Sequence, residues 1–210
     1  MNLKELKLEE VELHASLLDE GLSAILHTIL FVRDPSTEVK PVDVACVKLG
    51  PLTYTKCGGR KDIHDHVKGS IKLLMNNLAP VGPNLKKSTL LLEFYDQREA
   101  QKFFGLITTT DKVVFERWHI PVRVDETTFS KSDMEQQSNE KAHFVHFAKE
   151  QIERSVLNII EQSSSIDHIP PTSLYQYDIT CSPYGIGNER QDQTLVAKLM
   201  YSPTLHSGLN

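Results

Sequence analysis

Apolar residues spaced three and four positions apart predict three amphipathic helices in this chain. The first is expected over residues 17–32, and Asp34-Pro35-Ser36 ends it because the residue before a proline disfavours helix. The second begins near Asp62, and the third covers roughly residues 135–162. Their buried stripes are expected at Leu18, Leu22, Ile25, Leu26, Ile29 and Leu30, at Ile63, Val67, Ile71, Leu74 and Leu78, and at Val145, Ala148, Ile152, Val156 and Ile159.

Between the helices, alternating or continuous apolar runs predict β-strands. Residues 6–13 alternate except for a slip at Glu9-Glu10, which indicates a first strand with a β-bulge. Pro121 cannot donate a hydrogen bond, so its strand is expected to lie at an edge or to carry a bulge. Further strands are expected over 42–49, 52–57, 89–95, 112–124 and 174–180. This order predicts an α+β domain with a largely antiparallel sheet.

Two segments lie outside this pattern. Residues 96–111 are mostly polar and are expected to form a loop between the two central strands. Phe103 and Phe104 in that loop either pack in a small satellite core or contact another subunit. Residues 182–210 are expected to form a tail with one possible edge strand at 194–201, which leaves the domain itself over 1–181.

Composition narrows the function classes. The chain has 210 residues, of which 40% are hydrophobic and 24% charged, and this suits one soluble domain with a true core. A net charge of −5 without a basic stripe disfavours a nucleic-acid binder. Three cysteines without Cys-x-x-Cys spacing and a charged N-terminal stretch favour an intracellular protein. No apolar run approaches the roughly 20 residues that span a bilayer, so no membrane span is expected.

The sequence offers weak candidates for catalysis or metal binding. Cys57 precedes a helix N-terminus, which can lower a thiol pKa, but the spacing positions no base beside it. A Cys57-dependent enzyme is therefore the least favoured hypothesis. His143, His146 and Glu150 share a helix face at ligand-like spacing but lack a further ligand. No metal and no cofactor are expected.

The third helix carries a second stripe opposite its buried one. At about 100° per residue, the members of this stripe lie within roughly 40° of one line. Phe147 and Leu157 are therefore large apolar residues on a face expected to meet water. Two scattered exposed hydrophobes are common on surfaces, whereas an arginine flanked by apolar contacts is typical of a protein-binding face. The stripe consists of His143, Phe147, Glu150, Arg154, Leu157 and Glu161.

The order and spacing of several motifs resemble the autophagy-related protein 101 family of HORMA-domain proteins. The resemblance covers residues 13–33 and 88–124 best. It implies a HORMA fold, with three helices packed on one side of a largely antiparallel sheet. The motifs are Ile25-Leu26-His27-Thr28-Ile29-Leu30, Leu92-Glu93-Phe94-Tyr95, Glu116-Arg117-Trp118 with the alternating strand after it, the long third helix, and Leu174-Tyr175-Gln176-Tyr177-Asp178-Ile179.

The resemblance also implies a function and a site. Family members are non-catalytic subunits of the autophagy-initiation kinase complex, found in the cytoplasm and at the phagophore assembly site. They bind the HORMA domain of autophagy-related protein 13 as a heterodimer and stabilise its folded form. Related HORMA domains dimerise through the third helix, which points to a partner-binding set of His143, Phe147, Glu150, Arg154 and Leu157.

The central loop and the tail leave alternatives open. Animal family members carry a Trp-Pro-Phe finger in the central loop, where this chain has Phe103-Phe104 as a possible second contact loop. Its single tryptophan, Trp118, matches a strand position and is expected in the core. The alternative function is a peptide-clasping HORMA adaptor of another signalling or checkpoint complex, in which residues 194–201 take part by strand addition.

Overall fold

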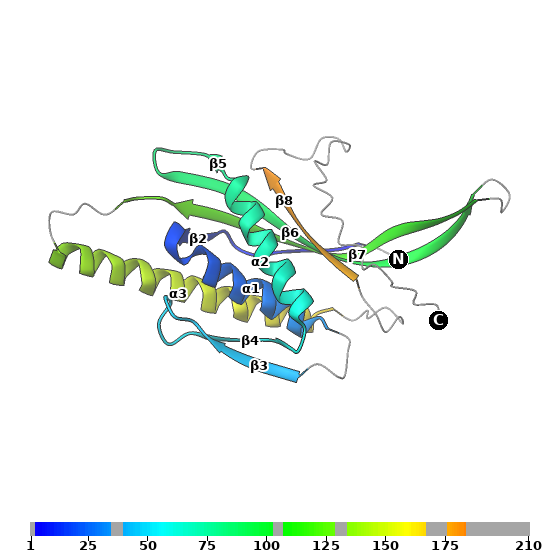
Figure 1. Cartoon of the computed structure of the whole chain (residues 1–210), viewed down its shortest axis with the longest axis horizontal. Coiled ribbons are helices and arrows are strands. Elements are labelled where there is room, and N and C mark those ends of the chain that lie inside the picture. The colour runs from blue at the N-terminus through cyan, green and yellow to red at the C-terminus, as the bar shows by residue number, and fades with distance from the viewer. Residues whose placement is uncertain (1–2, 35–39, 103–106, 129–133, 167–175, 184–210) are drawn as a thin grey trace, which may run out of the picture.

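A six-stranded sheet, centred on the long antiparallel pair β6–β7, forms one layer of the molecule (Figure 1). The computed structural model describes residues 3–34, 40–102, 107–128, 134–166 and 176–183. β1 and β2 pair with β7 in parallel, whereas β5 and β8 pair with β6 antiparallel, so the sheet is largely antiparallel as predicted. The strands are β1 (Lys4–Lys7), β2 (Val11–His14), β5 (Ala79–Pro80), β6 (Leu85–Lys102), β7 (Ile107–Asp125) and β8 (Gln176–Pro183).

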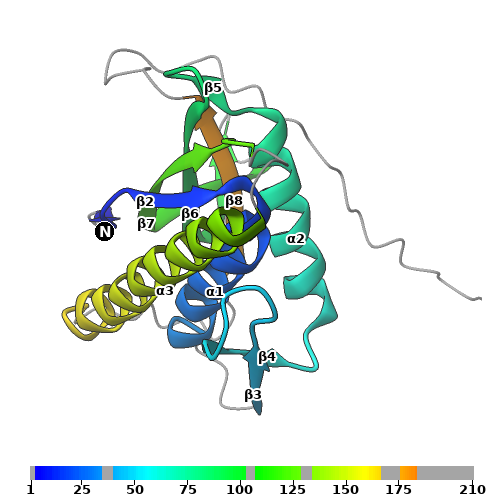
Figure 2. The ribbon, with the colours of Figure 1, turned by 90° about the vertical axis from the view of Figure 1, so that its left-hand side faces the viewer.

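Three helices form the second layer and cover one face of the sheet (Figure 2). α1 lies between α2 and α3 and contacts both, and the antiparallel hairpin β3–β4 packs against α1. This arrangement confirms the predicted α+β architecture. The remaining elements are the 3₁₀ turn η1 (Ala15–Leu17), α1 (Leu18–Val32), β3 (Lys40–Ala45), β4 (Thr53–Gly58), α2 (Lys61–Asn76) and α3 (Met134–Ser164).

The N-terminal strand contains the predicted bulge. Lys7 pairs with His119 and Val11 with Val122, so four steps along the N-terminal chain match three along β7. The extra residue separates β1 from β2 and sets Glu9 and Glu10 apart from the ladder. Pro121 falls in this interval of β7. The bulge prediction is therefore confirmed for the N-terminal strand. Of the two alternatives expected for Pro121, an edge or a bulge, the bulge holds, because β7 has partners on both sides and Pro121 lies opposite the bulged segment.

The central loop is shorter than predicted. β6 runs to Lys102 and β7 starts at Ile107, so most of residues 96–111 belong to a continuous hairpin. This hairpin projects from the body of the sheet as a two-stranded ribbon (Figure 1). β8 pairs with β6 only as far as Tyr95, and beyond that point the ribbon extends past the helices (Figure 1). Apolar alternation is required where a sheet face packs on such a layer. Phe103 and Phe104 lie outside the described residues.

The predicted helix stripes form the core. All six stripe residues of α1 are at most 3% exposed, and Trp118 is fully buried, as expected. By length and composition alone, Ala15–Val32 is apolar enough to cross a membrane. Here that segment is the central helix of the packed layer, and ten of the fifteen residues of α1 are buried. Its position between two helices and a sheet accounts for its hydropathy.

One core residue, His27, is expected to make the fold sensitive to acid. Its ring is 1% exposed, lies parallel to the rings of Tyr54 and His64, and has no hydrogen-bond partner among the described residues. Burial, followed by the nearby positive charges of His64 and Lys56, lowers the pKa of His27 from 6.5 to about 4. Between these values the unfolded chain binds a proton that the folded chain does not. Stability is therefore lost as the pH falls.

We expect His27 to remove about 3 kcal/mol of unfolding free energy as the pH falls from about 6.5 to about 4. Urea denaturation at pH 7.5 and at pH 4.5 measures most of this loss. His27→Phe should reduce the difference between the two pH values, whatever it does to stability at pH 7.5. His146→Gln, at a side chain that is 72% exposed, serves as the control and should keep the wild-type difference. An unchanged difference in His27→Phe would contradict the assignment.

Candidate protein-binding face

The second stripe of α3 lies on the surface of the molecule. His143, Phe147, Glu150, Arg154 and Leu157 are all exposed, and so is Glu161. Phe147 is 41% exposed and Leu157 is 68% exposed, which are high values for large apolar side chains. We refer to these six residues as the outer face of α3. The structure therefore brings the predicted residues together on one accessible surface.

A third exposed apolar residue extends the outer face. Ile160 is 47% exposed and lies three residues after Leu157, so the two side chains are neighbours on the helix surface. Ile160 does not belong to the predicted stripe, because it falls about 100° away from Glu161 on the helix surface. Phe147, Leu157 and Ile160 together form a discontinuous apolar surface along the outer side of α3.

The opposite side of α3 is fixed to the rest of the domain. Ala148, Ile152 and Ile159 are buried, and Val145 and Val156 pack against the same core, as the first stripe predicted. Two glutamines on the flank of α3 add hydrogen bonds to the edge of the sheet. Gln151 Oε1 accepts the main-chain N–H of Glu12 at 2.8 Å, and Gln162 Nε2 donates to the carbonyl oxygen of Lys7 at 3.0 Å. The outer face is therefore presented by a helix whose position is set by core and edge contacts.

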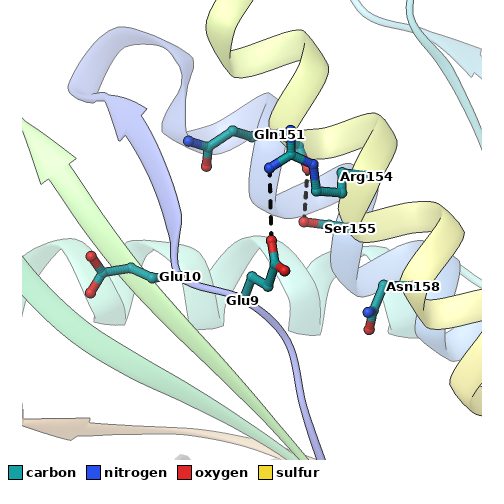
Figure 3. A pocket seen from close by; sticks show the side chains of 6 residues that line it. All are labelled: Glu9, Glu10, Gln151, Arg154, Ser155 and Asn158. Atoms are coloured by element: carbon teal, nitrogen blue, oxygen red, sulfur yellow. Dashed lines mark hydrogen bonds and ion pairs between the residues drawn. The ribbon is translucent and has the colours of Figure 1, made fainter.

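The charged residues of the outer face interact weakly with their neighbours. Arg154 reaches toward the N-terminal bulge, where its Nη1 lies 3.8 Å from Oε2 of Glu9 (Figure 3). Glu150 lies 3.7 Å from His146 Nδ1, and Lys149 lies 3.5 Å from Glu153. Exposed pairs of this kind contribute little to stability. These side chains can therefore exchange their present partners for those of another protein at small cost.

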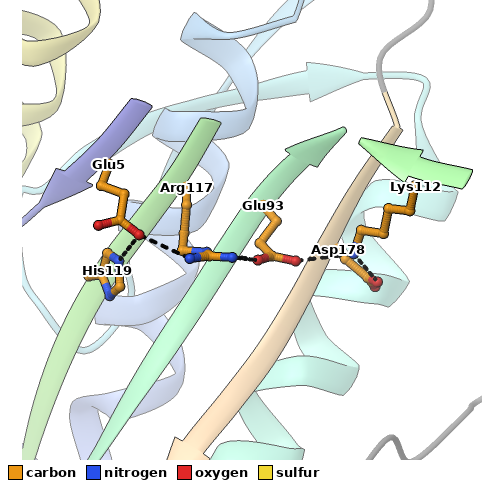
Figure 4. A network of polar contacts seen from close by, with 6 residues as sticks. All are labelled: Glu5, Glu93, Lys112, Arg117, His119 and Asp178. Carbon is orange, nitrogen blue, oxygen red and sulfur yellow. Dashed lines mark hydrogen bonds and ion pairs between the residues drawn. The ribbon is translucent and has the colours of Figure 1, made fainter. Parts of the chain in front are cut away.

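The face of the sheet that the helices do not cover carries charged side chains that are paired with one another (Figure 4). Arg117 lies 2.9 Å from Glu5 and 2.7 Å from Glu93, and Lys112 lies 3.1 Å from Glu93 and 3.2 Å from Asp178. Burial raises the pKa of Glu93, but hydrogen bonds from Lys112 and Arg117 outweigh it and hold that pKa below its usual value. This network joins β1, β7, β6 and β8 and is best explained as cross-strand stabilisation.

The Cys57 thiol and the histidine candidates of α3 occupy separate environments. Burial, with a further contribution from Asp34, raises the pKa of the Cys57 thiol to about 11, so the thiol is protonated at neutral pH. Its Sγ lies 3.8 Å from Oδ2 of Asp34, and a carboxylate there disfavours the thiolate. Within the described ranges, no group of three or more His, Cys, Asp or Glu side chains is arranged to hold a metal ion.

Comparison with known proteins identifies relatives over nearly the whole chain. The family model described as autophagy-related protein 101 matches residues 10–175. An autophagy-related protein 101 of Arabidopsis thaliana is 26% identical over 219 aligned residues, which cover 99% of this chain and 97% of that protein. The matched region contains β2, all three helices and the central β6–β7 pair.

Proposed function

Because the chain belongs to the autophagy-related protein 101 family, we propose that it is a non-catalytic subunit of the autophagy-initiation kinase complex. In this role it binds the HORMA domain of autophagy-related protein 13 in a heterodimer. A partner that binds the folded form of that domain stabilises it by mass action. The proposal places the protein in the cytoplasm and at the phagophore assembly site.

The observation that supports this proposal most strongly is the outer face of α3. Three large apolar side chains, Phe147, Leu157 and Ile160, remain 41%, 68% and 47% exposed on a helix that is otherwise fixed to the core. A rigid helix loses little conformational freedom on binding, and apolar anchors surrounded by polar residues are typical of protein interfaces. We assign His143, Phe147, Glu150, Arg154 and Leu157 to the contact with the partner.

Two further regions belong to the proposal. Phe103 and Phe104 are assigned as a second contact loop at the end of the β6–β7 ribbon, in the position where animal family members carry their finger. Residues 182–210 are assigned as a tail that follows the HORMA domain of residues 1–181.

Light scattering on a size-exclusion column tests the proposal directly. We expect this chain, mixed with the autophagy-related protein 13 HORMA domain of the same organism, to elute as a stable one-to-one complex. Each protein is first run alone, and circular dichroism verifies that both are folded. Two folded components that elute separately at micromolar concentration would contradict the proposed function.

A further inference from the structure

A shallow groove lies beside the outer face, between α3 and the N-terminal bulge (Figure 3). Glu9 and Glu10 of the bulge form one wall, and α3 forms the other. The groove exists because the extra residue of the bulge interrupts the strand opposite a polar flank of the helix. The helix wall consists of Gln151, Arg154, Ser155 and Asn158.

The two glutamine contacts mark the ends of this groove. Gln151 binds the main chain of β2 at Glu12, and Gln162 binds the last residue of β1, Lys7. Both contacts cover main-chain groups on the outer side of this edge strand, which protects the edge from unwanted strand pairing. The bulge lies between them, so Glu9 is held next to the outer face without being covered by it.

The two carboxylates of the bulge differ in how well they are neutralised. Glu10 lies 2.6 Å from Lys87 Nζ and 3.9 Å from Arg123. Glu9 has one cationic neighbour among the described residues, Arg154, at 3.8 Å, which is longer than a hydrogen bond. The side chains of Glu9 and Arg154 are 74% and 68% exposed. The Glu9 carboxylate is therefore the polar group of the groove that a new partner can engage most easily.

The charge of the surface around the groove indicates which kind of side chain the groove would bind. Glu9, Glu150 and Glu161 carry three negative charges around the outer face, against one positive charge on Arg154. Lys149 and Glu153 cancel one another on the adjacent flank. A surface of this sign attracts positively charged side chains and repels carboxylates.

We propose that the groove receives a lysine or arginine side chain of the bound partner, which pairs with Glu9 and takes the place that Arg154 occupies in the free chain. This inference rests on the proposed function, because it assumes that the outer face of α3 meets the HORMA domain of autophagy-related protein 13. It assigns Glu9, far from α3 in the sequence, to the same interface. Arg154 acts in the free chain as a temporary counter-ion for Glu9.

The test compares two substitutions of Glu9 by calorimetric titration with the autophagy-related protein 13 HORMA domain at 50 and 300 mM NaCl. At 50 mM NaCl we expect Glu9→Gln to weaken affinity about 10-fold and Glu9→Lys about 100-fold. The wild-type affinity should fall as salt increases.

Asp65→Lys provides the matched control, since Asp65 is an exposed carboxylate on α2 and the substitution makes the same change of charge. It should alter affinity less than 2-fold. Wild-type binding with an unaffected Glu9→Lys variant would overturn the inference while leaving the proposed function intact. Tighter binding by Glu9→Lys would also overturn it and would indicate an acidic occupant. Absence of wild-type binding would instead refute the proposed function itself.

Discussion

Replacing Phe147 and Leu157 together by aspartate is expected to weaken binding to the autophagy-related protein 13 HORMA domain about 100-fold or more. Both side chains are exposed and apolar in the free chain, at 41% and 68%, so their burial would contribute favourable free energy to a complex. Two anchors of about 2 kcal/mol each would give about 1000-fold if they were additive, which interface residues rarely are. Aspartate also adds negative charge where apolar contact is needed. The affinity is measured by calorimetric titration.

A matched control separates loss of contact from loss of fold. Met75 and Val81 are 49% and 42% exposed on another part of the surface, and Met75→Asp with Val81→Asp makes the same change of charge. This control variant should bind with wild-type affinity. Circular dichroism and urea denaturation should show that both double variants remain folded, because exposed apolar residues contribute little to the core. Equal affinities of the two double variants would show that α3 does not meet the partner.

The placement of the outer face could be predicted because helical periodicity is local. Once Val145, Ala148, Ile152, Val156 and Ile159 are assigned to the core, the geometry of the α-helix directs the opposite stripe to the surface. The exposure of Ile160 could not be predicted in this way. It lies on a flank of α3, where exposure depends on whether a neighbouring element reaches that point. α1 has 15 residues and α3 has 31, so α1 cannot cover the whole length of α3.

The contacts between segments far apart in the sequence also could not be predicted from sequence patterns. The slip at Glu9-Glu10 indicated a bulge correctly, but nothing local to it showed that Arg154 would lie opposite. Likewise, Glu116 was part of a motif that supported the family resemblance, and its pairing with Arg33, 83 residues away, depends on the folded topology. Pattern analysis identifies which side of an element is buried, whereas the partner of a polar residue is decided by tertiary packing.

The β6–β7 ribbon shows that strands can form where the sequence lacks the apolar alternation used to predict them. Residues 96–111 lack apolar alternation and were therefore predicted to form a loop, yet most of them form paired strands. Alternation arises where one face of a sheet is buried, and a two-stranded ribbon beyond the helix layer has no buried face to require it. The strands continue there because β6 and β7 keep their main-chain pairing beyond the part of the sheet that packs against the helices.

Removing the carboxylate of Glu116 is expected to be the most destabilising single change among the charged residues considered above. Glu116 is 1% exposed and accepts hydrogen bonds from Arg33 Nε at 3.0 Å, from Arg33 Nη2 at 2.7 Å and from Trp118 Nε1 at 2.6 Å. Arg33 is the C-cap residue of α1 and is itself 8% exposed. The pair therefore connects the end of the central helix to β7.

Glu116→Ala should lower the free energy of unfolding by about 3–5 kcal/mol, because it leaves the guanidinium of Arg33 buried without a counter-charge. Urea denaturation measures the loss. Glu126→Ala removes a carboxylate that is 40% exposed and pairs with Lys86 at 2.8 Å, and it should cost less than about 1 kcal/mol. Glu116→Leu combined with Arg33→Met should recover part of the stability lost in Glu116→Ala, since it removes both charges and leaves only the Trp118 Nε1–H without its acceptor. Equal stabilities of Glu116→Ala and Glu126→Ala would show that the buried pair does not hold α1 against the sheet.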